Sequence, residues 1–113
     1  MNKKLVTFSM VLMGFMGGSA YADTKLSGSE LFTHHGCVNC HGNEAKNPIS
    51  KVVPTLAGKP ADELFVKAKK ILSGEGSSKE SQIMHAAFYS PSQCDNPPTD
   101  AELKSITNWI SKL

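Results

Sequence analysis

Residues 37–41 read Cys-Val-Asn-Cys-His, and no other stretch of the 113-residue chain constrains its fold so strongly. Two cysteines three positions apart, with a histidine directly after the second, form the attachment pattern of a c-type haem. Each thiol can add across one haem vinyl group to give a thioether, and the adjacent histidine can then reach the iron. We therefore expect a haem covalently bound at Cys37 and Cys40, with His41 as the proximal iron ligand.

Three other kinds of site use similar residues, and the sequence favours haem over each of them. A zinc site needs four ligands, commonly from two paired clusters, whereas only Cys94 and scattered histidines remain in this chain. A thioredoxin-like redox motif needs a βαβ setting, of which the sequence gives no sign. A structural disulfide between Cys37 and Cys40 would leave His41 without a role.

The first 22 residues have the pattern of a secretory signal peptide. Lys3 and Lys4 give a basic start, residues 5–16 are apolar, and residues 20–22 read Ala-Tyr-Ala, which suits a signal peptidase. The apolar run, residues 5–16, is shorter than the roughly 20 residues that a membrane-spanning helix needs. We expect residues 1–22 to be cleaved and residues 23–113 to form one domain in the bacterial periplasm. An uncleaved N-terminal anchor is the alternative.

The composition of residues 23–113 does not indicate a nucleic-acid-binding protein. Ten lysines remain after Lys3 and Lys4 are removed from the twelve basic residues, and they are matched by ten acidic residues. The net charge is then near zero, without the basic excess that nucleic-acid binding needs. A chain of this size has a small core, and three cysteines cannot all pair with one another. A buried haem would supply the apolar surface that such a core lacks.

Helical signals dominate the chain after residue 22, whereas strand signals are weak. Ser27 and Glu30 have capping-box spacing at the start of a short helix that ends near Gly36 and turns Leu31 and Phe32 inward. We expect His34 and His35, at the end of this helix, to face solvent. Residues 42–58 read as a loop, because they contain repeated glycine, asparagine and proline.

Two further helices are predicted downstream, with a third segment between them that is a short helix or a turn. Apolar residues recur at helical spacing from Leu64 to Leu72, directly after Pro60. Residues 78–88 form the less certain segment and should turn four side chains toward the core: Ile83, Met84, Ala87 and Phe88. Residues 90–98 read as a loop. Thr99 and Glu102 then begin a last helix, whose apolar positions are Leu103, Ile106, Trp109, Ile110 and Leu113.

A haem that transfers electrons needs a second axial ligand, and methionine or histidine usually provides it. Met84 is the only methionine of residues 23–113, and it lies far enough downstream to reach the other haem face. Its neighbour His85 is the runner-up ligand. Without a haem, Met84 would be read as a flexible core residue.

Two more residues have open interpretations. The Pro54 carbonyl could accept a hydrogen bond from the His41 ring and fix the imidazole, or Pro54 could be an ordinary turn proline. Cys94 could be a small buried residue, or it could pair with a second chain and give a disulfide-linked dimer.

The chain after residue 22 resembles the small bacterial class I cytochromes c. The resemblance rests on Gly28 and Phe32, on the motif of residues 37–41, on Val-Pro-Thr-Leu-Ala-Gly at residues 53–58, on Met84, and on residues 103–110. It implies a fold of three to five helices around one haem, with the first and last helices crossing where Gly28 meets Trp109. It also implies the Pro54 to His41 hydrogen bond and Met84 as the distal ligand.

The function implied by this resemblance is electron transfer in the periplasm, by one covalent haem c with histidine and methionine ligands. Such a protein transforms no substrate, so we do not expect an enzyme. Its partners would be redox proteins that bind transiently, through small interfaces. A permanent haem subunit of an oxidoreductase complex is the alternative, followed by a haem protein that binds gases or other ligands.

Overall fold

Five α-helices and one 3-10 turn make up the part of the chain that the computed structural model describes, residues 26–90 and 96–113. The helices are α1 (Gly28–His34), α2 (Val38–His41), α3 (Ala61–Leu72), α4 (Lys79–Phe88) and α5 (Asp100–Ser111), and the turn is η1 (Asn43–Ala45). No strand occurs within these two ranges, so the all-α prediction is confirmed. The expected signal peptide and Cys94 lie outside the described residues.

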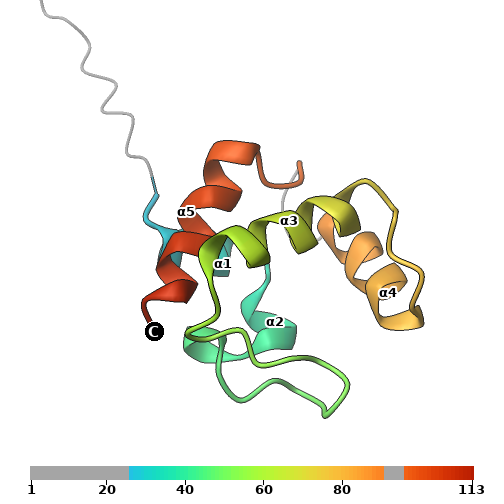
Figure 1. The fold of residues 1–113 in the computed structure, drawn as a ribbon, viewed down its shortest axis with the longest axis horizontal. Coiled ribbons are helices and arrows are strands. Elements are labelled where there is room, and N and C mark those ends of the chain that lie inside the picture. The colour runs from blue at the N-terminus through green and yellow to red at the C-terminus, as the bar shows by residue number, and fades with distance from the viewer. Residues whose placement is uncertain (1–25, 91–95) are drawn as a thin grey trace, which may run out of the picture.

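The first and last helices pack against each other and form the frame of the fold (Figure 1). At their crossing, a Cβ atom added to Gly28 would collide with the Ser105 carbonyl and lie 2.6 Å from the Cβ atom of Trp109. The Phe32 and Trp109 rings also pack here, with their centroids 5.3 Å apart. The absence of a side chain at Gly28 is therefore what lets the two backbones approach so closely.

Both frame helices begin with the capping box that the sequence predicts. The Ser27 hydroxyl accepts from the Glu30 N–H at 3.2 Å, and the Glu30 carboxylate accepts from the Ser27 N–H at 2.7 Å. Thr99 and Glu102 repeat this exchange at the start of α5, at 3.2 and 3.0 Å. Each box satisfies two backbone donors that would otherwise have no partner in the helix.

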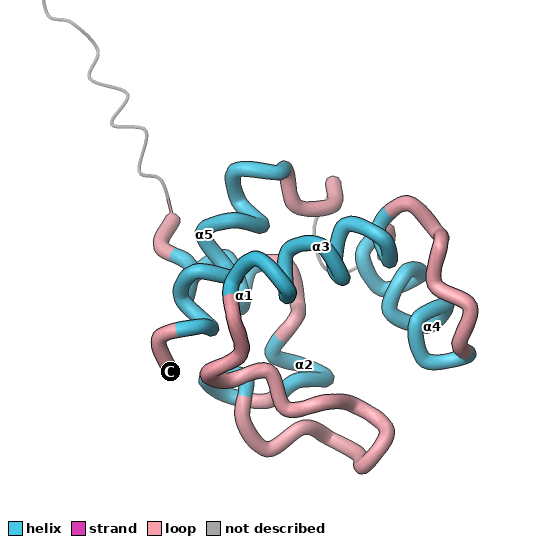
Figure 2. Tube along the Cα trace, in the orientation of Figure 1, coloured by secondary structure: helices cyan, strands magenta, loops and turns pink. Residues whose placement is uncertain are grey.

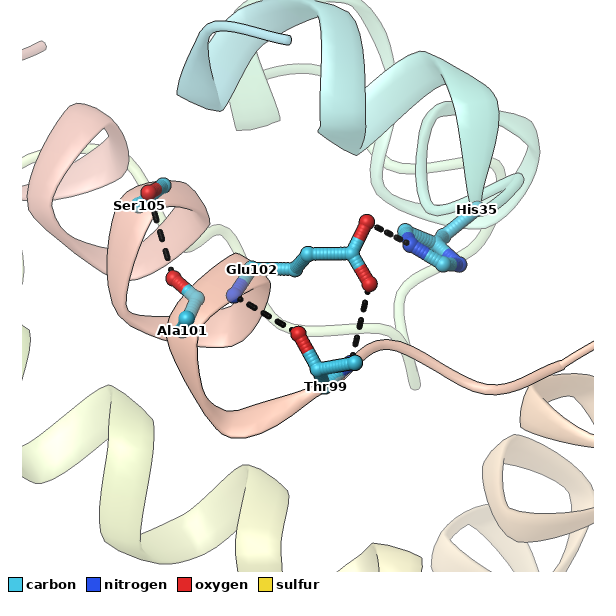
Figure 3. A network of polar contacts seen from close by, with 5 residues as sticks. All are labelled: His35, Thr99, Ala101, Glu102 and Ser105. Atoms are coloured by element: carbon cyan, nitrogen blue, oxygen red, sulfur yellow. Dashed lines mark hydrogen bonds and ion pairs between the residues drawn. The ribbon is translucent and has the colours of Figure 1, made fainter. Parts of the chain in front are cut away.

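His35 is buried, so the prediction that it faces solvent is wrong; its neighbour His34 is exposed as expected. The His35 ring nitrogen Nε2 lies 3.3 Å from a carboxylate oxygen of Glu102, which joins the end of α1 to the start of α5 (Figure 3). The Thr99 N–H, with a smaller contribution from His35, holds the pKa of Glu102 below its ordinary value. Helical spacing alone could not place His35 against a residue 67 positions away.

The helix α3 connects this frame to α4, because it packs against both α5 and α4. Its Leu64 and Ala68 side chains are buried. A long loop, residues 46–60, leads into α3, and a shorter connection, residues 73–78, leads from α3 to α4 (Figure 2). One continuous core joins the elements: Leu31, Phe32, Ala45, Leu64, Ile106 and Ile110.

The segment that the sequence left open between helix and turn is the ten-residue helix α4, capped by the Ser78 hydroxyl. None of its side chains is buried, so the expectation that four of them reach the core is only partly met. Met84 and Phe88 are half-buried, whereas Ile83 and Ala87 are exposed. The reason is that α4 packs principally against α3, which covers one side of it.

The close contact at Gly28 gives a direct test of the frame. Gly28→Ala should lower the free energy of unfolding by about 1–3 kcal/mol, because the added methyl group must push α1 away from α5. Denaturant unfolding of the haem-loaded protein measures the loss. Ser29→Ala, at the exposed neighbouring position, is the matched control and should change stability by less than about 0.5 kcal/mol. Equal stabilities for the two variants would contradict the close approach.

Candidate functional site

The two cysteines of the motif lie on one short helix. Cys37 is the N-cap of α2, and the His41 N–H donates to the Cys37 carbonyl at 3.0 Å. Residues three apart on a helix lie on neighbouring parts of its surface, so Cys37 and Cys40 are neighbours in space. Both are half-buried, and no disulfide joins one to the other. The turn therefore presents two adjacent thiols, with a histidine directly after the second.

The His41 side chain is buried, with 6 % of its surface exposed, and its ring orientation is fixed by one hydrogen bond. Nitrogen Nδ1 lies 3.2 Å from the carbonyl oxygen of Pro54. A carbonyl oxygen can only accept, so Nδ1 must carry a proton, and in the neutral ring Nε2 then keeps its lone pair. Burial lowers the pKa of His41, and the bond to Pro54 opposes this shift only in part. His41 is thus a neutral imidazole with Nε2 available, which is the form that binds metals.

The chain reverses direction directly after His41 and returns to place Pro54 beside it. Gly42 makes the reversal at φ +79°, where a Cβ atom would lie 2.5 Å from the Asn47 carbonyl oxygen. The Ile49 N–H then donates to the Cys40 carbonyl at 3.0 Å. Ala45, fully buried with φ 54°, accepts at its carbonyl from the N–H groups of Leu56 and Ala57. These bonds hold residues 42–57 as a defined loop against α2.

Met84 lies on a different element, the helix α4. Figure 1 shows α2 and α4 on the same side of α3, at different points along it. Cys37, Cys40, His41 and Pro54 therefore form one group, while Met84 lies on a separate helix that α3 supports. The adjacent His85 also donates from its Nδ1 to a backbone carbonyl, that of Ile71 in α3, at 2.7 Å.

These residues have the chemistry that a covalent haem requires. Two neighbouring thiols can form the thioethers, and the neutral His41 can ligate through Nε2. Large apolar side chains of the loop and of α4 are open to solvent at Ile49, Val52 and Ile83, which are 69 %, 63 % and 60 % exposed. Apolar side chains of this kind gain stability when an apolar ligand covers them. The donor set and this uncovered surface fit a haem.

Several contributors to the site give no clear signal in the sequence. Gly42 and Ala45 define the return of the loop, yet their positive φ angles depend on contacts that local sequence does not specify. Tyr89 reaches the Leu72 carbonyl with its hydroxyl at 2.9 Å, and only its spacing of four residues from His85 could have linked the two. The pairing of Cys94 stays a prediction, since that residue lies outside the described part of the chain.

Comparison with known proteins gives one match. The cytochrome c family model matches residues 26–113, which begin just before α1 and include every described helix. No curated protein and no solved structure matches the chain.

Proposed function

The chain belongs to the cytochrome c family and carries covalently bound haem c, and from this premise we propose that it is a one-electron carrier with His41 and Met84 as axial ligands. When bound, the haem supplies an iron that cycles between the ferric and ferrous states. Cys37 and Cys40 would hold it through thioethers.

The single observation that carries the proposal is the hydrogen bond from His41 Nδ1 to the Pro54 carbonyl, at 3.2 Å. It selects the tautomer with the lone pair on Nε2, and it prevents the ring from rotating. A backbone carbonyl on the other ring nitrogen is the usual partner of a metal-bound histidine, and it raises the basicity of the ligating nitrogen. Pro54 would therefore act on the iron through His41.

Two observations favour Met84 over His85 as the second ligand. Because Nδ1 of His85 donates to Ile71 at 2.7 Å, only its Nε2 could ligate, and that nitrogen lies at the connection between α3 and α4, 3.9 Å from a Cβ atom built on Gly74. Met84 is half-buried on the same helix, and it is the only methionine of residues 23–113. A methionine sulfur raises the reduction potential of a haem relative to a second histidine. The proposal is thus a carrier of comparatively high potential.

An iron with two protein ligands has no open position for a substrate, which supports electron transfer over catalysis. A gas-binding protein would need an open or easily displaced sixth position. A permanent haem subunit would have the same ligands but would purify together with a larger partner. We infer electron transfer to transient redox partners, because such encounters need only small interfaces around the site.

We also propose that the protein works in the periplasm. The support is the basic, apolar and small-residue pattern of residues 1–22, which predicts export. Within residues 26–90 and 96–113, no helix has the length and apolar character needed to cross a membrane.

Replacing the proposed distal ligand tests the ligation. Met84→Ala should remove the low-spin, methionine-ligated absorption spectrum, lower the reduction potential and let carbon monoxide bind the ferrous protein rapidly. The wild-type protein should resist carbon monoxide. Val66→Ala, an exposed apolar position on α3, is a control and should leave the spectrum unchanged. A Met84→Ala protein with the wild-type spectrum would show that another group is the ligand.

The intact mass of the purified protein tests processing and haem attachment together. We expect the mass of residues 23–113 plus one haem, still present after denaturation. A double variant, Cys37→Ala with Cys40→Ala, should lose the covalent haem, whereas Cys94→Ala should keep it. A mass that includes residues 1–22 would contradict the cleavage, and two haems per chain would contradict the single site.

A further inference from the structure

We propose that His85 and Tyr89 are positioning residues for Met84: they attach α4 to the end of α3 and thereby fix the direction in which Met84 faces the haem. This inference rests on the proposed function, since it assumes that Met84 is the distal ligand. It assigns a role to two side chains that hydrogen-bond to α3, His85 on α4 and Tyr89 at the C-cap of α4.

The attachment consists of two hydrogen bonds from α4 to consecutive carbonyls of α3. The His85 Nδ1 donates to Ile71 at 2.7 Å, and the Tyr89 hydroxyl donates to Leu72 at 2.9 Å. The last carbonyls of a helix have no partner within it, so they are strong acceptors for side chains from elsewhere. The two rings also pack against each other, with centroids 5.1 Å apart. Together they form one contact surface at the C-terminal end of α3.

These bonds matter because little else holds α4 in place. None of its side chains is buried, and its principal packing partner is α3. A helix without buried anchors can rotate about its axis or slide at small cost. The two hydrogen bonds oppose both motions, since each joins a fixed position on α4 to a fixed position on α3.

The spacing along α4 transmits this constraint to Met84. His85 and Tyr89 are four residues apart and share one face of the helix. Met84 precedes His85 by one residue, so its side chain leaves the helix roughly 100° around the axis. Holding the face of His85 and Tyr89 against α3 therefore sets the direction of Met84. A rotation of α4 about its axis would strain or break these two bonds.

The remaining ring nitrogen of His85 faces the connection between α3 and α4. A Cβ atom added to Gly74, in that connection, would lie 3.6 Å from Cε1 and 3.9 Å from Nε2 of the ring. A small pocket at the same place is lined by residues of this connection and of α4, including Gly76, Ser81 and His85. The His85 ring is thus bonded to Ile71 through Nδ1, while its other side borders this small pocket within the α3–α4 unit.

The consequence is a measurable competition at the iron. An external ligand such as imidazole can bind the ferric protein only in molecules whose Met84 has left the iron. Its apparent affinity therefore reports how often that state occurs. His85→Leu should raise the imidazole affinity by up to about tenfold, which is the effect that loss of one hydrogen bond can supply. Tyr89→Phe should raise it about two- to threefold, because the Tyr89 side chain is already 52 % exposed.

The conservative variant is His85→Asn. Its side-chain NH₂ group can still donate to the Ile71 carbonyl, but asparagine has no second nitrogen that could bind the iron as Nε2 could. It should restore the wild-type imidazole affinity and reduction potential at least in part. Lys79→Leu is the control: it also replaces a polar side chain by leucine, at an exposed position of α4 away from this pocket, and it should have no effect. Tyr89→Phe removes a single hydroxyl, so it provides the test if His85→Leu does not fold.

The experiment titrates imidazole into each ferric, haem-loaded variant and records the absorption spectrum and the reduction potential. Higher affinity in His85→Leu and Tyr89→Phe, with recovery in His85→Asn, is the expected result. Wild-type affinity in both His85→Leu and Tyr89→Phe would overturn the positioning role while Met84 ligation stands. Loss of the low-spin spectrum in His85→Asn, together with an unchanged spectrum in Met84→Ala, would instead show that His85 is the ligand. That result would overturn the proposed function itself.

Discussion

The hydrogen bond between His41 and the Pro54 carbonyl is the interaction on which the site depends. It joins the α2 turn to a loop that returns 13 residues later, and it fixes both the tautomer and the orientation of the imidazole. The reversal at Gly42 and the hydrogen bonds to the carbonyls of Ala45 and Cys40 hold the loop in the path that places Pro54 beside His41. If the loop took another path, His41 would lose the hydrogen-bond partner of its Nδ1.

The frame of α1 and α5 supports the cysteine turn, which follows directly after α1 in the chain. The Gly28 contact, the Phe32–Trp109 packing and the His35–Glu102 pair all join the two ends of the chain. The Cys37 N–H donates to the Phe32 carbonyl at 3.0 Å, so the cysteine turn continues directly from α1. The position of the cysteine turn therefore depends on the position of α1 in the frame. The opposite side of the site depends on α3 and α4, which have fewer buried contacts.

Much of the fold could be predicted from the sequence because its signals are local. Capping boxes at Ser27 and Thr99 and the apolar spacing of α5 need only neighbouring residues, and they were interpreted correctly. His35 was misplaced because its partner Glu102 lies 67 residues away. The exposure of Ile83 on α4 was missed for a different reason. Apolar spacing indicates which face is apolar, but not whether the surface that covers it is protein or haem.

The central claim is that the chain holds one covalent haem c through residues 37–41. The reduced-minus-oxidised absorption spectrum of the native protein, followed by its pyridine haemochrome after acid–acetone extraction, tests this claim most directly. We predict a haem c haemochrome that stays with the polypeptide, from a native protein with a low-spin spectrum in both oxidation states. A haem that extracts into the solvent, or a protein purified without haem absorption, would contradict the account.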